Sequence, residues 1–148
     1  MWSDRILDEA QAAIEEIHPG IDVEKRFADM REAFDDALIT GWRDLEPGIS
    51  LPDRDDRHVV AAAIRAGAQA IVTSNTRDFP EATLRDLDLE AVHPDDFLLD
   101  QLDLSPATVL QVTREQASHT SHPRLTPQDL AVLLSRAGVP RAQLPWQE

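Results

Sequence analysis

Two sets of carboxylate side chains lie on either side of one apolar segment of the sequence. Asp53, Asp55 and Asp56 precede this segment, and Asp78 follows it. Carboxylates that are brought together repel one another and resist desolvation, and a divalent cation with oxygen ligands, Mg²⁺ or Mn²⁺, is the usual remedy. The alternative is that each aspartate caps a helix or forms a turn, because Asp is strongly favoured at both kinds of position.

The segment between these aspartates has the pattern of a helix followed by a buried strand. Small apolar side chains after Asp56 form one helical face, and Gly67 is expected to end the helix in the left-handed conformation. Residues 68–73 form a continuous apolar run, which is typical of a strand covered on both faces. A short strand at residues 49–51 is expected before the aspartates. Because ligands of parallel sheets collect beyond the carboxyl ends of the strands, both acidic loops are expected at one edge.

Helices are predicted for most of the remaining chain. They span residues 4–17, 22–45 and 81–87, with further helices after residues 93, 105 and 126, and a last strand spans residues 89–92. In the first helix, capped by Ser3, Glu9 falls near the border of the apolar stripe. A border carboxylate can reach a cleft, or it can belong to the solvated flank that amphipathic helices normally have.

The central motif resembles the core signature of a known nuclease family. The run DRDDRHVVAAAIRAGAQAIVTSNTRDFP, residues 53–80, is similar to the PIN domain of VapC-type toxins, in the branch with T-x-N-x-x-D-F after the strand. WSDRILDE, residues 2–9, resembles the family's second helix with its acidic residue. LEAVHPDDFL, residues 89–98, resembles the last strand and the following helix, and residues 106–143 resemble a helical extension that some members carry.

The resemblance implies an α/β fold with a parallel sheet flanked by helices, in a PIN-like domain of residues 1–103 with a helical extension of residues 104–148. PIN domains begin with a central strand that ends in an Asp and is followed by a helix, and this sequence has no counterpart of either. We therefore expect an N-terminally incomplete domain. Three explanations stay open: a truncated or mis-set start, a partner chain or swapped protomer that supplies the strand, and a degenerate gene product.

The activity that the resemblance implies is hydrolysis of RNA phosphodiester bonds with Mg²⁺ or Mn²⁺. The family pattern places the catalytic metal ligands at Glu9, Asp56 and Asp78. Asn75 occupies the place where many PIN domains have another Asp, so it is expected to orient water or substrate, with Thr73 as its support. The basic side chains expected to meet the phosphates are those of Arg54, Arg57 and Arg77.

Partners also follow from the resemblance. A toxin of this kind acts on RNA and is covered by a cognate antitoxin protein, and a homodimer or a chain that supplies the missing strand is the further expectation. The rival hypothesis is a truncated, catalytically inactive PIN remnant that acts as a protein-binding module. Whether the chain is an enzyme therefore depends on whether its site is completed.

Composition limits the function classes. The formal charge of −14 argues against broad phosphate binding, which needs a basic surface, unless metal ions neutralise the site. The absence of cysteine suits the cytoplasm, and no segment approaches the roughly 18 apolar residues of a membrane span. His119 and His122 have an i, i+3 spacing, but zinc needs three or four ligands, so a polar loop is favoured there.

Overall fold

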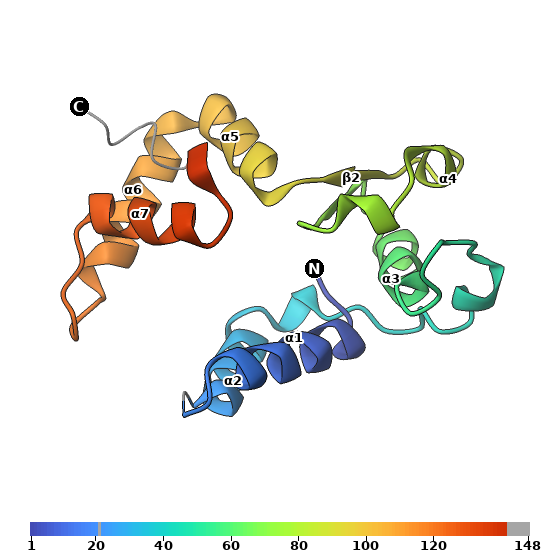
Figure 1. The fold of residues 1–148 in the computed structure, drawn as a ribbon, viewed down its shortest axis with the longest axis horizontal. Coiled ribbons are helices and arrows are strands. Elements are labelled where there is room, and N and C mark those ends of the chain that lie inside the picture. Colours follow the sequence, from blue (N-terminus) through green and yellow to red (C-terminus); the bar gives the residue numbers. More distant parts are fainter. Residues whose placement is uncertain (21, 142–148) are drawn as a thin grey trace. The chain divides into compact units, whose positions relative to one another are not determined.

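The computed structural model describes residues 1–20 and 22–141, and it is mixed α/β, mostly helical with a small sheet (Figure 1). The α-helices are α1 (Asp4–Ile17), α2 (Val23–Ala33), α3 (Arg57–Ala66), α4 (Glu81–Arg85), α5 (Pro94–Leu104), α6 (Pro106–Ser118) and α7 (Pro127–Arg136). The strands are β1 (Ala70–Val72) and β2 (Glu90–Val92), and the 3-10 helices are η1 (Asp35–Ala37), η2 (Glu46–Gly48) and η3 (Thr76–Asp78). No described helix combines the length and apolar character that crossing a bilayer requires.

The chain divides into two compact units. Unit 1 comprises Met1–Ile71 and Arg77–Ala91, and unit 2 comprises Val72–Thr76 with the chain from Val92 onward. Helix α5 clusters with the helices that follow it, because it packs against α6. The domain boundary between residues 103 and 104 stays a prediction, whereas the compact units separate before α5.

The larger apolar core of unit 1 forms around α3. Val60, Ala61 and Ala62 of this helix are buried together with Trp42 and Leu84. The small side chains of α3 allow neighbouring segments to approach closely, as the sequence pattern predicts. Helix α3 ends where expected, because Gly67 has a φ of 62° and its N–H returns to the carbonyls of the last turn.

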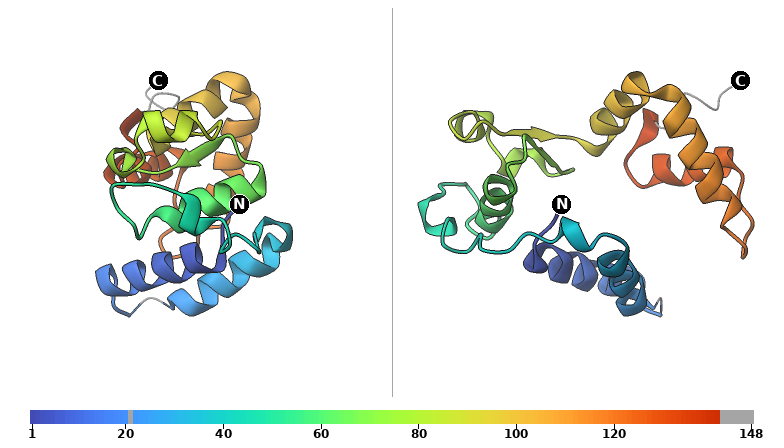
Figure 2. Two further views of the ribbon diagram at one scale, coloured as in Figure 1. Left: turned by 90° about the vertical axis from the view of Figure 1, so that its right-hand side faces the viewer. Right: turned by 180° about the vertical axis from the view of Figure 1, so that it is seen from behind.

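A second apolar core joins α1 and α2, which lie side by side in both Figure 1 and Figure 2. Leu7, Val23 and Phe27 are its buried side chains. The predicted first helix is confirmed with its cap, since Ser3 Oγ accepts the Ile6 N–H at 3.2 Å. The chain before α1 is held by an isolated parallel bridge between Trp2 and Leu38.

The sheet consists of two parallel strands. The N–H of Glu90 donates to the carbonyl of Gln69, and the N–H of Thr73 donates to that of Val92, each at 3.0 Å. Strands are thus present within the predicted ranges 68–73 and 89–92. The predicted strand at residues 49–51 is wrong, because Ile49 and Leu51 are buried by packing on the α3 core without a strand partner. The alternating pattern of residues 49–51 therefore reflects which side chains are buried, and it does not indicate hydrogen bonding to a neighbouring strand.

The predicted long helix over residues 22–45 is also wrong beyond its first half. Helix α2 ends at Ala33, and Phe34 leaves the helical conformation with φ −134° and ψ 57°. The backbone then pairs with Trp2, and Trp42 enters the α3 core. These tertiary contacts override the helical periodicity of the sequence.

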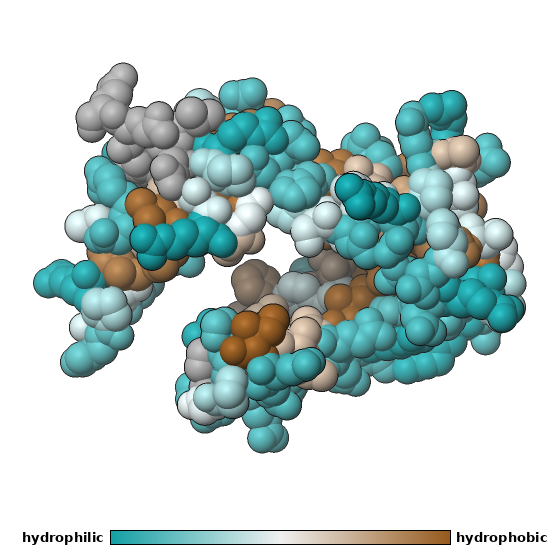
Figure 3. Space-filling model, viewed as in Figure 1, coloured by the Kyte–Doolittle hydropathy of each residue, from teal (hydrophilic) through white to brown (hydrophobic). Residues whose placement is uncertain are grey.

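Unit 2 is built mainly from α5, α6 and α7. Helix α7 begins with a complete capping box, in which Thr126 and Asp129 bond reciprocally to each other's backbone N–H. The buried apolar side chains of unit 2 include those of Ala117, Ala131 and Val139, whereas Leu104 and Val112 are exposed. Figure 3 shows a largely hydrophilic surface with apolar patches on it.

Candidate metal centre

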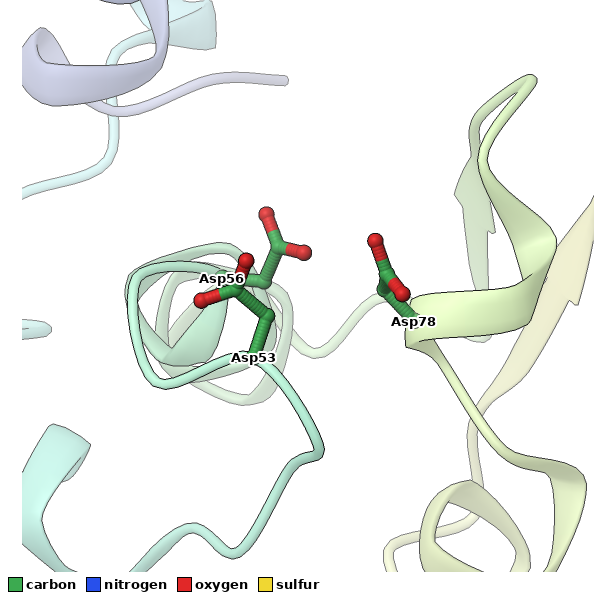
Figure 4. Close-up of side chains that lie close together, drawn as sticks. All are labelled: Asp53, Asp56 and Asp78. Atoms are coloured by element: carbon green, nitrogen blue, oxygen red, sulfur yellow. The ribbon is translucent and has the colours of Figure 1, made fainter.

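Three aspartates of unit 1 lie close together. Asp53, Asp56 and Asp78 each offer a carboxylate oxygen, and these oxygens all lie within 4.8 Å of one another. In Figure 4, Asp78 faces the other two side chains. Asp53 belongs to the loop before α3, Asp56 is the N-cap residue of α3, and Asp78 ends η3. The two acidic loops predicted from the sequence therefore do converge, and we call these three side chains the aspartate cluster.

The capping alternative accounts for part of this arrangement. Asp56 occupies the N-cap position of α3, but its side chain makes no cap hydrogen bond. Asp53 does stabilise a turn, because its Oδ1 accepts the N–H of Asp55 at 2.8 Å. The carboxylate of Asp56 is thus not held by the helix that it precedes.

The electrostatics of the aspartate cluster favour a bound cation. Burial raises the pKa of Asp56, and the negative charges of Asp53 and Asp78 raise it further, against a smaller opposing effect of His58. Neither Asp53 nor Asp56 forms an ion pair with an arginine or lysine of the described residues. Carboxylate oxygens are the ligands that Mg²⁺ and Mn²⁺ prefer, so the donor set fits these ions.

Glu9, which the resemblance assigns as a ligand, lies outside the aspartate cluster. Its Oε1 accepts the Nε–H of Arg5 at 2.9 Å, and its Oε2 lies 3.0 Å from Nε2 of His58. The charge of Glu9 nevertheless adds to the effects that raise the pKa of Asp56. Its role as a metal ligand stays a prediction.

The other predicted residues are near the aspartates in the sequence. Thr73 and Asn75 fall in the segment of unit 2, where Thr73 Oγ1 accepts the backbone N–H of Asn75 at 3.1 Å. Arg77 is exposed in η3, and Arg54 is exposed before α3. Arg57 begins α3 half-buried, and its Nε has no hydrogen-bond partner among residues 1–20 and 22–141.

From the sequence, Asp53 was expected among the clustered acids but not chosen as a metal ligand, and His58 was not singled out. Asp53 stands three residues before Asp56, and a turn between them brings both carboxylates to the same side. His58 is 1% exposed, which the helical periodicity of α3 could have indicated because the residue stands two positions before Val60 and one turn before Ala61 and Ala62. Burial lowers the pKa of His58, and the charge of Glu9 opposes this effect.

Comparisons with known proteins agree with the motifs. Residues 94–142 match the family model of the VapC50 C-terminal domain. The chain is also 45% identical over 94 residues to a protein named putative ribonuclease VapC50 from Mycobacterium tuberculosis (strain ATCC 25618 / H37Rv), a match that covers 64% of this chain and 55% of the relative. The chain thus matches about half the length of this curated relative, and no solved structure matches it. Together with the motif at residues 53–80, these matches support a relationship of the chain to VapC-type proteins.

Proposed function

We propose that the chain carries the site of a Mg²⁺- or Mn²⁺-dependent endoribonuclease of the PIN type, which hydrolyses RNA phosphodiester bonds. The observation that carries the proposal is the convergence of Asp53, Asp56 and Asp78 within 4.8 Å. The choice of RNA rests on the relative, which is named a putative ribonuclease. A PIN-like sheet, more extensive than the two strands described, is part of the same proposal.

Asp53, Asp56 and Asp78 would hold the cation. When bound, it would neutralise the clustered charge and act as a Lewis acid toward the phosphate. Asp53 is added here to the ligands expected from the sequence, Asp56 and Asp78, because it shares their cluster. Glu9 stands beside the cluster, and Thr73 and Asn75 are proposed to orient water or substrate.

Substrate binding must overcome the charge of the chain, which is −14 overall. A polyanion approaches such a surface only where cations gather. Arg54 and Arg77 are exposed and flank the aspartates in the sequence, so we propose that they contact phosphates, with Arg57 as a third candidate. Weak, strongly metal-dependent RNA binding is the consequence.

Partners belong to the same proposal. Two strands rarely make a stable sheet alone, so we propose that a further strand pairs with it, from a second copy or another chain. A cognate antitoxin would cover the aspartate cluster. A cytoplasmic location is part of the same proposal.

The alternative is an inactive PIN remnant that binds another protein. Large apolar side chains exposed in unit 2 favour it, notably Leu104 at 80% and Val112 at 53%. A remnant of this kind needs no convergence of carboxylates around a cation. Metal affinity therefore separates the two functions.

The first experiment is calorimetric titration of Mn²⁺ into the chain and into the Asp56→Asn variant. Binding by the wild type that disappears in the variant supports the metal site, since an amide is a weaker, neutral ligand. RNA cleavage with Mn²⁺ is then measured for both proteins, with circular dichroism as the control for folding. No binding by a folded wild type, or equal cleavage by both proteins, would contradict the proposal.

A further inference from the structure

The carboxylate of Glu9 is held at both oxygens by residues on opposite sides. Arg5, one turn earlier on α1, donates to Oε1 at 2.9 Å, and Nε2 of His58 on α3 contacts Oε2 at 3.0 Å. The two helices are thereby joined through this one side chain. The Glu9 side chain is 53% exposed, whereas that of His58 is 1% exposed. His58 is therefore the buried side of the contact, and Glu9 is the exposed side.

The contact defines the tautomer of the buried imidazole. An ionised carboxylate only accepts hydrogen bonds, so the proton of the contact belongs to Nε2 of His58. Nδ1 of His58 is buried and has no hydrogen-bond partner in the part of the chain that the structure describes. Among residues 1–20 and 22–141, the polar contact of this buried ring therefore goes to Glu9. Burying an imidazole without hydrogen-bond partners costs free energy, so an apolar side chain would be expected at this position if it served only to fill the core.

Glu9 needs such a donor to stay where it is. Its negative charge acts on Asp56, so the two carboxylates repel each other. Arg5 binds Glu9 from the same helix, and it also reaches the carbonyl of Asp55 at 3.3 Å, in the loop of the aspartate cluster. Of these two described partners of Glu9, His58 is the one that is buried in the core.

We propose that His58 is a positioning residue that holds the Glu9 carboxylate beside the aspartate cluster, where its charge increases the affinity for a divalent cation. This inference rests on the proposed metal site of Asp53, Asp56 and Asp78. Residues that orient a charged group next to a metal site commonly change metal affinity by about ten- to 100-fold when they are replaced. His58 would act through Glu9, without touching the cation or the substrate.

The test compares two amide substitutions of His58. In His58→Gln the side-chain amide reaches the place of Nε2, so the donor to Glu9 is kept. In His58→Asn the amide ends near the place of Nδ1, and the donor to Glu9 is lost. Mn²⁺ affinity is measured by calorimetry. We expect about ten-fold weaker binding for His58→Asn, and affinity within about three-fold of wild type for His58→Gln.

The Glu9→Gln background shows whether His58 acts through Glu9. Glu9→Gln alone is expected to weaken Mn²⁺ binding as much as His58→Asn does, and adding His58→Asn to it should change nothing further. Thermal melting of each variant shows whether the fold is kept. If the role of His58 were merely structural, its replacement would lower the melting temperature, but the folded protein would bind Mn²⁺ with unchanged affinity.

Each outcome has a distinct meaning. Wild-type affinity in folded His58→Asn, or in the surface variant Glu9→Gln, would overturn the role of His58 and leave the aspartate cluster intact as a metal site. Additive effects of His58→Asn and Glu9→Gln would also overturn it. If His58→Asn does not fold, wild-type affinity of Glu9→Gln overturns the role of His58, and weaker binding by Glu9→Gln together with wild-type affinity of His58→Gln supports it. Absence of Mn²⁺ binding by the wild type would overturn the proposed function itself.

Discussion

Two groups of acidic side chains in this protein differ in how their charge is compensated. In unit 1, Asp53 and Asp56 have no arginine or lysine partner among the described residues, and their charges meet within one cluster with Asp78. In unit 2, Asp95 and Asp96 both form ion pairs with Arg141. The carboxylates of Asp95 and Asp96 are thus compensated by a side-chain cation, whereas those of Asp53 and Asp56 have no such ion pair among the described residues.

The two groups also differ in the direction of their pKa shifts. Burial raises the pKa of Asp95, but the guanidinium and backbone N–H of Arg141 outweigh it and leave the pKa below its ordinary value. The two bonds measure 2.6 Å and 2.9 Å. At Asp56, burial and neighbouring carboxylates act together and raise the pKa.

This difference separates a structural role from a candidate site. An acid with satisfied oxygens in a buried position anchors the chain that it binds, and Asp95 anchors the residues after α7 to the start of α5. An acid whose pKa is raised by like charges costs stability in the empty state. Such a cost is typical of functional sites, and the aspartate cluster is therefore the better candidate.

The largest expected effect concerns the membership of Asp53 in the metal site. We expect Asp53→Asn to weaken Mn²⁺ binding by more than about 100-fold, which exceeds the usual effect of residues that only support a ligand. The amide oxygen can still accept the N–H of Asp55, so the turn is kept. Calorimetric titration measures the change.

Asp55→Asn is the matched control for this variant. Asp55 lies in the same loop and is exposed, but its carboxylate is not part of the aspartate cluster. Its affinity for Mn²⁺ should stay within about two-fold of wild type, because exposed charges are screened by salt. Equal effects of the two substitutions would mean that only the overall charge of the loop matters.

A smaller effect is expected from removing an ion pair between Asp95 and Arg141 in unit 2. Asp95→Asn removes one of the two charged partners of Arg141, the buried one, so the segment after α7 should detach from α5 more easily. Faster amide hydrogen exchange in α5 and α7, with unchanged exchange in α1 and α3, is the expected result.

The pH dependence of Asp95 gives a second test of the same contact. Because its folded pKa is depressed, the stabilisation is complete above its unfolded pKa of about 3.9 and is lost as the pH falls through the folded pKa. Wild-type unit 2 should therefore lose protection below about pH 4, and Asp95→Asn should lose less on acidification. Equal acid sensitivity of the two proteins would contradict this assignment.

Local signals allowed much of the fold to be predicted. The ends of α1 and α3 follow from Ser3 and Gly67, because caps act within one helical turn. The end of α2 does not follow, since it depends on the pairing of Leu38 with Trp2 and on the burial of Trp42. These contacts join residues far apart in the sequence, and periodicity does not encode them.

The same distinction between local signals and contacts distant in the sequence applies to the candidate site. The convergence of the loops of Asp56 and Asp78 was expected from the sequence, although one of the two strands on which the expectation rested, at residues 49–51, is absent from the described structure. The partners of Glu9 were not, since helical periodicity gives the direction of a side chain but not the residue that it meets. His58 lies on another helix, and only the packing of α1 near α3 brings it to Glu9.

Asp129, in the capping box of α7, is a third acidic side chain, whose charge is stabilised by hydrogen bonds and not by an arginine. Hydrogen bonds from the hydroxyl and backbone of Thr126 lower the pKa of Asp129 without any cation. We expect Thr126→Ala to destabilise unit 2 by about 1 kcal/mol, the usual value for a lost N-cap. Hydrogen exchange of the α7 amides measures it, with Thr108→Ala on α6 as a control for loss of a hydroxyl. Unchanged α7 protection would mean that the box contributes nothing to stability.

The smallest expected effect is a gain of stability in the empty aspartate cluster. Asp56 has a raised folded pKa, so its favourable contribution is present below its unfolded pKa of about 3.9 and is lost as the pH rises through the folded value. Asp56→Asn should therefore stabilise the metal-free chain at pH 7 by less than about 1 kcal/mol, since solvent screens a half-buried group. Urea unfolding followed by tryptophan fluorescence measures this gain, which should vanish below pH 4 and shrink in high salt. A loss of stability at pH 7 would show that Asp56 already has a compensating partner, and the contrast with Asp95 would then disappear.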